Sequence, residues 1–190
     1  MDNALPKRKH TRLQGYDYNT AGVYFITICT QDRKQVLSEI VKPTPTNISV
    51  GGDVLDAPQI QLLSYGKIVD KYIRQLHDFY KSIQVDRYVI MPDHVHILLT
   101  VLDDGASRTS PPTECDIGAS RTSPPTKQHS AVSRFVSTLK RFCNKDYGYN
   151  IWQRHFYDHI IRDQDDYEEH LKYIHENPIS WYYEQERTEK

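Results

Sequence analysis

Two histidines separated by a single residue are the first feature of the chain that could do chemistry. His94 and His96 lie in the stretch YVIMPDHVHILL, residues 88–99. If this stretch is a strand, alternate side chains share one face, so both imidazoles can reach one metal ion. The ordinary alternative is a pair of core or surface histidines, because a His-x-His pair also arises by chance.

A tyrosine and an amide nearer the C-terminal end could complete such a site. Tyr173 and Asn177 are four residues apart in a segment with helical spacing, so they face the same way. Tyrosine is a weak nucleophile at its ordinary pKa of about 10, and a cation that polarises a phosphodiester would allow it to attack. Imidazole with amide, water and phosphate oxygens suits Mg²⁺ or Mn²⁺ better than Zn²⁺. The alternative for Tyr173 is a boundary aromatic that packs its ring and exposes its hydroxyl.

Positive charge gathers in one stretch, although the whole chain carries a net charge of −1. Residues 131–162 hold six Lys and Arg against two Asp, whereas residues 163–190 hold nine acidic residues against three basic ones. Within a predicted helix, Arg134, Arg141 and Lys145 share a stripe, as expected of a surface that follows the phosphates of single-stranded DNA. Ordinary solvated charge on a surface helix is the other interpretation.

Strands are expected around the histidine pair. Residues 23–30 and 94–101 are rich in β-branched and aromatic side chains, which is typical of strands. Residues 83–91 are expected to form another, and the short Met-Pro-Asp turn that follows implies antiparallel neighbours. A last strand is expected at about 152–161. In the strand over 83–91, four alternating apolar residues are expected to share one face: Ile83, Val85, Val89 and Met91.

Helical spacing of apolar residues predicts three helices. The first covers residues 65–80, the second 132–143, and the third runs from Asp163 to about Asn177. Asp163 can cap the third helix, and Pro178 is expected to end it.

The chain is expected to form one domain, 1–190, with two flexible inserts at about 42–58 and 103–130. Its 190 residues, 38% of them hydrophobic, suit a single core. The first insert would enlarge the turn of a hairpin between residues 36–39 and 60–62. The second contains the nonapeptide GASRTSPPT twice, and sequence of this composition has little apolar surface to bury.

Composition also argues against several classes of protein. No apolar run is long enough to cross a membrane, and the polar, basic N-terminus does not resemble a secretory signal. Cys29, Cys115 and Cys143 are an odd, scattered set, which argues against a disulfide framework or a zinc knuckle. A reduced, cytoplasmic protein is therefore expected.

The motifs together resemble the REP-associated tyrosine transposases, within the HUH (His-hydrophobe-His) single-tyrosine transposases of the insertion-sequence-200 type. This joint pattern is far more specific than the histidine pair alone, and it follows the family's order along the chain. It implies an α+β fold, an antiparallel sheet with helices packed on it. The stretches that carry it are residues 15–34 (GYDYNTAGVYFITICTQDRK), 88–99 (YVIMPDHVHILL), 151–162 (IWQRHFYDHIIR) and 166–178 (DYEEHLKYIHENP).

The resemblance also implies roles for single residues. His94 and His96 match the family's metal ligands, Asn177 the third, helix-borne ligand, and Tyr173 the nucleophile. Family members cleave single-stranded DNA beside a folded hairpin, form a 5′-phosphotyrosine and rejoin strands by the reverse attack. The expected cofactor is Mg²⁺ or Mn²⁺, and the expected partner is single-stranded DNA with hairpins. Relatives include dimers and monomers, so a homodimer is an open expectation.

Three other functions are compatible with parts of the pattern. A domesticated protein could bind DNA hairpins without cutting them. A hydrolase could use a histidine-bound metal on water, with Tyr173 merely structural. A plasmid relaxase or replication initiator would share the histidine motif, but such proteins are usually larger and fit the arrangement from Tyr88 to Pro178 poorly.

Overall fold

The computed structural model describes residues 16, 18–42, 58–103 and 130–188. Both predicted inserts fall almost entirely outside this part of the chain, and so does Cys115. The expectations that the inserts are flexible and that residues 1–190 form one domain therefore stay predictions.

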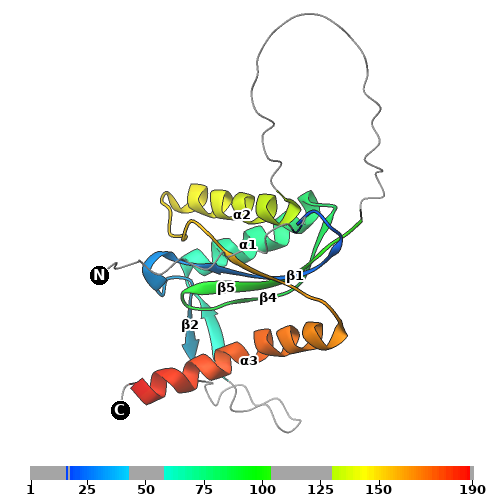
Figure 1. The fold of residues 1–190 in the computed structure, drawn as a ribbon. Helices are drawn as coiled ribbons and strands as arrows, with labels where there is room; N and C mark the ends of the chain where they lie inside the picture. The colour runs from blue at the N-terminus through cyan, green and yellow to red at the C-terminus, as the bar shows by residue number, and fades with distance from the viewer. Residues whose placement is uncertain (1–15, 17, 43–57, 104–129, 189–190) are drawn as a thin grey trace, which may run out of the picture.

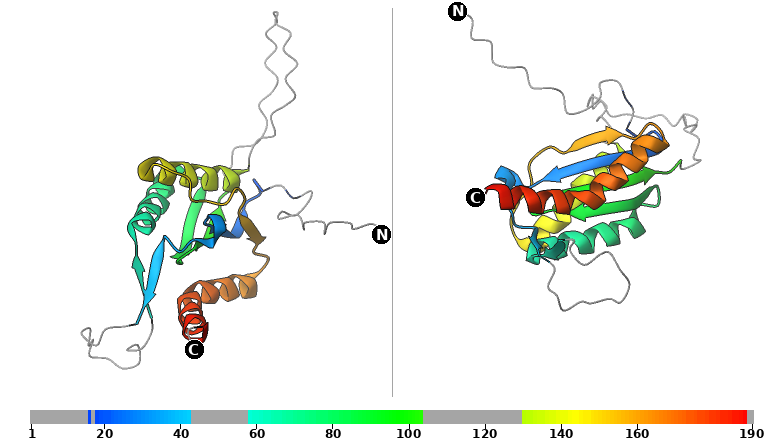
Figure 2. Two further views of the ribbon diagram at one scale, coloured as in Figure 1. Left: turned by 90° about the vertical axis from the view of Figure 1, so that its left-hand side faces the viewer. Right: turned by 90° about the horizontal axis from the view of Figure 1, so that it is seen from below.

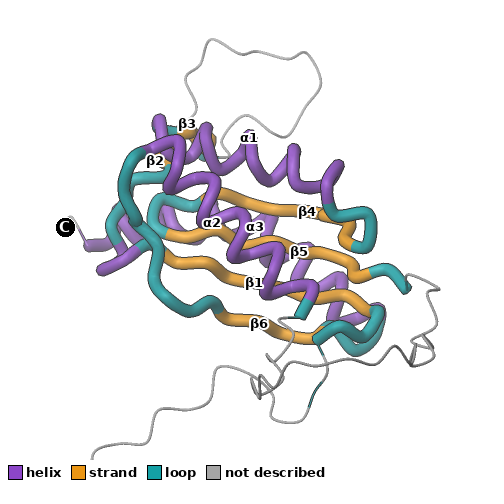
Figure 3. The backbone as a smooth tube through the Cα atoms, turned by 90° about the horizontal axis from the view of Figure 1, so that it is seen from above, coloured by secondary structure: helices purple, strands orange, loops and turns teal. Residues whose placement is uncertain are grey.

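Four antiparallel strands form the main sheet, in the order β4-β5-β1-β6 (Figure 3). The sheet places the histidine strand, β5, at its centre beside β1, with β4 and β6 at the two edges. The strands are β1 (Gly22–Cys29), β4 (Ile83–Ile90), β5 (His94–Val101) and β6 (Tyr157–Ile160).

Three of these strands begin and end close to the predicted positions, and one is shorter. The strand expected at about 152–161 is confined to β6, because the chain before Tyr157 meets the sheet only at a single bridge between Thr30 and Trp152. Trp152 is nevertheless buried, so this segment packs on the core without pairing as a strand.

Helices cover both faces of the sheet (Figures 1 and 2). Helices α1 (Ser64–Phe79) and α2 (Ala131–Tyr147) pack together on one face, and α3 (Gln164–Thr188) crosses the other. None of the described helices has both the length and the apolar character needed to cross a bilayer. The arrangement is the predicted α+β fold, an antiparallel sheet with helices packed on it.

A large apolar core fills the space between the sheet and α1 and α2, whereas α3 covers a smaller one. On β5, Val95, Ile97 and Leu99 enter the large core and Leu98 enters the smaller core. The predicted alternation of this strand is thereby confirmed. The smaller core contains the buried residues Phe25, Val89, Met91, Leu98 and Ile174.

A separate hairpin extends from the sheet. Strands β2 (Ser38–Val41) and β3 (Gln59–Leu62) pair antiparallel, which confirms the hairpin predicted around the first insert. The Ser38 hydroxyl donates a 2.8 Å hydrogen bond to the carbonyl of Ile90, which ties the hairpin to the end of β4.

The prediction that Ile83, Val85, Val89 and Met91 share one face of the sheet is wrong. The pairing of β4 with β5 shifts by one residue between Val85 and Arg87, which is a β-bulge. The extra residue reverses the alternation, so Val85 packs on the large core while Val89 and Met91 enter the core under α3. Ile83 shares the side of Val85. This segment therefore contributes apolar side chains to the cores on both faces of the sheet.

Helix α3 begins as predicted but does not end where predicted. The backbone N–H of Asp166 donates to Asp163 Oδ1 at 2.9 Å, so Asp163 caps the helix. Pro178 lies inside the helix, which continues to Thr188. An interior proline costs about 3 kcal/mol. Burial of Pro178 and packing of Trp181 against the smaller core offset this cost, so the helix continues past the proline.

Candidate metal and nucleophile site

The two histidines of β5 point toward α3 and meet there. Both side chains are buried, and their Nε2 atoms lie 2.9 Å apart. Two ligands that each lie about 2.1 Å from one ion, at right angles to each other, are separated by about 3.0 Å. His94 and His96 are therefore spaced like two neighbouring corners of an octahedral metal shell.

Each imidazole is held in place through its other nitrogen. The Asp93 carboxylate lies 2.5 Å from His94 Nδ1, and Thr27 Oγ1 lies 2.8 Å from His96 Nδ1. A carboxylate only accepts hydrogen bonds, so His94 Nδ1–H donates to it, and in the neutral imidazole Nε2 is then the nitrogen with the lone pair. This carboxylate-histidine pairing is the usual support of a metal-bound imidazole. Asp93 is itself buried and pairs with Arg33, Nε to Oδ2 at 3.0 Å.

Electrostatics also suit a cation between the rings. Burial, with a contribution from neighbouring His94, lowers the pKa of His96 to about 3, so this imidazole is neutral at neutral pH. When Thr27 Oγ1 accepts from His96 Nδ1–H, both Nε2 lone pairs face each other, an arrangement that a bound cation stabilises. The donor set thus fits a divalent ion.

Helix α3 brings the predicted tyrosine and asparagine to the histidines. Asn177 Nδ2 lies 3.5 Å from His96 Nε2, and a half-turn of the amide would bring its oxygen to the same place. The Tyr173 ring meets His96 edge to face, with 5.1 Å between ring centroids. Tyr173 is 48% exposed, so its phenol is accessible to a large substrate. Phe25 stacks on His96 and supports both rings from β1.

These side chains open onto a cleft of about 720 Å³. Its lining includes residues that the sequence did not single out as site residues, among them Arg33, Tyr157 and Glu176. Arg33 supplies a positive charge; its Nη1 also donates to Cys29 Sγ at 2.9 Å. It is the last residue of the short 3₁₀ turn Gln31–Arg33, and its φ of 54° is left-handed.

Two observations bear on these additional residues, one from the sequence and one from the strand register. Arg33 lies within the first stretch of family resemblance, residues 15–34. Tyr157 pairs with Thr27 across the sheet, and Thr27 pairs with His96 in turn. A strand register would have placed Tyr157 on the face of the histidines, but the sequence alone does not give that register.

The predicted basic stripe lies elsewhere. Arg134, Arg141 and Lys145 belong to α2, on the opposite face of the sheet from α3 (Figure 1). Arg134 and Arg141 line a separate shallow cleft of about 270 Å³, together with Tyr80 and two hydroxyl-bearing residues of α2. The structure therefore brings His94, His96, Tyr173 and Asn177 together but does not bring the basic stripe to them.

Relatives are found by sequence, although no family model matches the chain. An uncharacterized protein of Haemophilus influenzae is 28% identical over 176 residues, which cover 92% of this chain and 89% of that protein. A second Haemophilus influenzae protein, provisionally named a REP-associated tyrosine transposase, is 26% identical over 86% of this chain and 73% of its own. The REP-associated tyrosine transposase of Escherichia coli is 27% identical over 52% of this chain and 46% of its own.

A solved structure shares the fold. The structure of a REP-associated tyrosine transposase bound to a REP hairpin superposes with a TM-score of 0.54 at 19% identity, covering 89% of this chain and 74% of that one. It confirms the fold class, and the named relatives confirm the resemblance to REP-associated tyrosine transposases. The names of these relatives support a transposase-type function, that of an enzyme which processes DNA.

Proposed function

We propose that the chain is a metal-dependent transposase and endonuclease that cleaves and rejoins single-stranded DNA near hairpins through a 5′-phosphotyrosine. The observation that carries this proposal is the meeting of Tyr173, from α3, with the histidine pair of β5 at 5.1 Å between the rings of Tyr173 and His96. The transposase names of the relatives support it, and the hairpin bound to the structural neighbour supports hairpin DNA as the partner.

In this mechanism His94, His96 and Asn177 would hold a Mg²⁺ or Mn²⁺ ion, and Asp93 keeps the His94 ring in the orientation that this requires. When bound, such an ion would polarise the scissile phosphate and neutralise its developing charge. Arg33 lines the same cleft and provides a further positive charge for the DNA backbone.

Tyr173 performs the covalent step. Its phenolic oxygen attacks the phosphorus, the bond from phosphorus to the 3′-oxygen breaks, and the phenolic proton leaves to solvent through the open cleft. The departing 3′-oxygen takes up a proton, which leaves a 3′-hydroxyl and a 5′-phosphotyrosine. Attack by a 3′-hydroxyl on the phosphotyrosine reverses these changes, rejoins the strand and regenerates the tyrosine.

The test compares two tyrosines of the same cleft. Labelled single-stranded DNA from the flanks of the gene is incubated with Mn²⁺ and with wild-type protein, Tyr173→Phe or Tyr157→Phe. A denaturing gel then reports covalent adducts. Tyr157 is the matched control, because it also lines the cleft and is similarly exposed, 56% against 48%. We expect Tyr173→Phe to bind DNA but form no adduct, and Tyr157→Phe to keep some cleavage.

Each other outcome would redirect the assignment. Full adduct yield from Tyr173→Phe would exclude it as the nucleophile, and loss confined to Tyr157→Phe would transfer the role to that residue. Cleavage by wild type without any adduct would favour a hydrolase that uses metal-bound water. Hairpin binding with neither cleavage nor adduct would favour a domesticated DNA-binding protein.

A further inference from the structure

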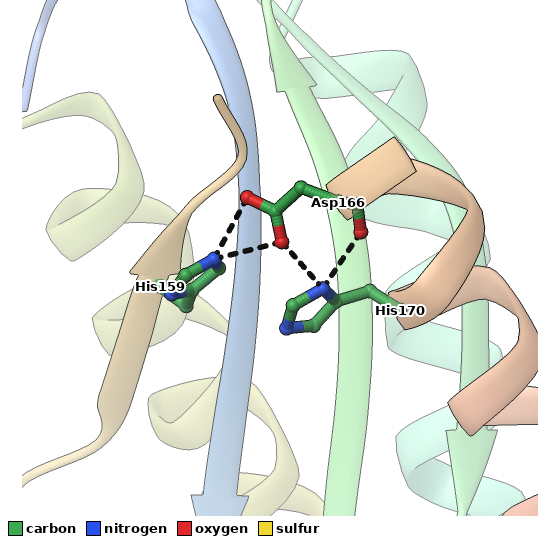
Figure 4. Close-up of side chains that lie close together, drawn as sticks. All are labelled: His159, Asp166 and His170. Carbon is green, nitrogen blue, oxygen red and sulfur yellow. Dashed lines mark hydrogen bonds and ion pairs between the residues drawn. The ribbon is translucent and has the colours of Figure 1, made fainter. Parts of the chain in front are cut away.

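A second group of metal-binding side chains lies at the start of α3 (Figure 4). His159 comes from the edge strand β6, and Asp166 and His170 come from the first turns of α3. Asp166 Oδ2 lies 2.9 Å from His159 Nε2, and Asp166 Oδ1 lies 3.0 Å from His170 Nδ1. One ligand atom from each residue can be chosen so that all three lie within 4.8 Å of one another.

The group is sheltered on one side and open on the other. The side chains of Asp166 and His170 are 17% and 19% exposed, whereas that of His159 is 44% exposed. The two imidazole rings stack nearly parallel, with centroids 4.6 Å apart. The open side leaves room for water to complete a coordination shell around an ion.

We propose that His159, Asp166 and His170 bind a divalent transition-metal ion such as Zn²⁺, at a site distinct from the histidine pair of β5. Two imidazole nitrogens and one carboxylate oxygen are ligands that Zn²⁺ takes readily, with water in the remaining position. Imidazole also suits Ni²⁺ and Cu²⁺, which are the alternatives to Zn²⁺ at this site. The single negative charge of Asp166 partly balances the charge of the ion.

Binding requires a change in the hydrogen bonds of the group. Carboxylate and carbonyl oxygens only accept, so without an ion His159 Nε2–H donates to the Asp166 carboxylate, and His170 Nδ1–H donates to the Asp166 backbone carbonyl at 2.8 Å. To ligate, each imidazole moves that proton to its other ring nitrogen or loses it to solvent. The Asp166 carboxylate then exchanges the hydrogen bond from His159 for a bond to the ion and keeps the one from the backbone N–H of Arg162.

An ion at this position would act as a clamp between β6 and α3. His170 packs on Phe25, with ring centroids 4.6 Å apart, and Phe25 stacks on His96 at 5.1 Å. The metal would therefore fix the helix that carries Tyr173 at a point one turn before that residue. This inference concerns ion binding by the folded chain and does not depend on the proposed reaction.

The test removes the histidine pair of β5 first, so that it cannot contribute. In the full chain carrying His94→Gln and His96→Gln, Zn²⁺ binding is measured by calorimetry and Co²⁺ binding by visible absorption. Adding His159→Gln should abolish one equivalent of bound ion. The matched control adds His175→Gln instead, because His175 is an exposed histidine of α3 outside the group. We expect the control to keep that equivalent, and equal binding by the two variants would overturn the proposal.

A measurement of thermal stability separates loss of the metal site from loss of the fold. Zn²⁺ should raise the Tm of the double variant and of its His175→Gln derivative, but not of the derivatives with His159→Gln or Asp166→Asn. Before Zn²⁺ is added, circular dichroism checks that each variant is folded. Equal increases in Tm across all the folded variants would show that these residues form a hydrogen-bonded link between β6 and α3 and not a metal site.

Discussion

The two faces of the sheet differ in what they bury. Under α1 and α2 the buried side chains are almost all apolar, and Val95, Ile97 and Leu99 of β5 lie among them. Under α3 the core is smaller, and β5 contributes two buried imidazoles beside it. A single strand therefore supplies packing on one face and chemistry on the other.

This difference shows how an apolar face can position a polar one. A slip of β5 by one residue would exchange its two faces and drive the histidines into the large core. Burial of Ile97 and its neighbours opposes that slip. The register of His94 and His96 is thus set by side chains on the opposite face of the strand from the candidate site.

The largest loss of activity is expected from a substitution on the face of β5 that carries the two histidines. His96→Gln should lower metal-dependent cleavage by about 10³-fold or more, because loss of one imidazole ligand removes several kcal/mol of stabilisation from the transition state. The melting temperature should change little. Asn177→Ala should be milder, because water can replace a neutral oxygen ligand. Equal Mn²⁺ binding, measured by calorimetry, in wild type and a His94→Ala, His96→Ala double variant would exclude this site.

The counterpart on the apolar face is Ile97→Ala. Ile97 is fully buried in the large core, so truncation should lower the free energy of unfolding by about 2–5 kcal/mol. Urea denaturation measures this loss. Adduct formation per folded molecule should be nearly unchanged under conditions where the variant remains folded. If activity instead fell as far as in His96→Gln, the division between the two faces would be wrong.

A smaller effect is expected from the support of His94. Asp93→Asn should weaken Mn²⁺ binding about 10- to 100-fold, the usual cost of losing an outer partner of a metal-bound histidine. The backbone carbonyl of Asp93, which accepts from Thr30, is unaffected by this change. Calorimetry with Mn²⁺ gives the comparison. An affinity equal to that of wild type would mean that His94 is oriented without the carboxylate.

The smallest effect is expected from the basic stripe of α2. Replacing Arg134, Arg141 and Lys145 by Ala should weaken binding of single-stranded DNA and reduce its salt slope by up to about 2, because fewer counterions are released. The measurement is a salt titration of DNA affinity. Since the stripe lies across the sheet from the cleft, an unchanged slope would confine DNA to the face of α3.

Much of the site could be predicted because its pieces follow local periods. The alternation of β5 puts His94 and His96 on one face, and the four-residue spacing of α3 aligns Tyr173 with Asn177. Both patterns depend only on neighbours along the chain. Family resemblance then suggested that the strand and the helix meet.

The features that could not be predicted depend on contacts between distant segments. The bulge after Val85 is set by pairing with β5, and composition gives no sign of it. Pro178 is tolerated in α3 because Trp181 finds a buried surface beyond it, near the ring of His94. Arg33 and Tyr157 reach the cleft from β1 and β6, through a turn and a register that the sequence does not specify.

The central position of β5 has a consequence for motion. His94 and His96 lie on a strand hydrogen-bonded on both sides, whereas Tyr173 lies on a single helix packed over a small core. We expect the backbone amides of β5 to exchange their hydrogens only on global unfolding, and those of α3 through a smaller opening. Such an opening would move Tyr173 away while the two imidazoles keep their places, so the proposed nucleophile could shift without disturbing the proposed metal ligands.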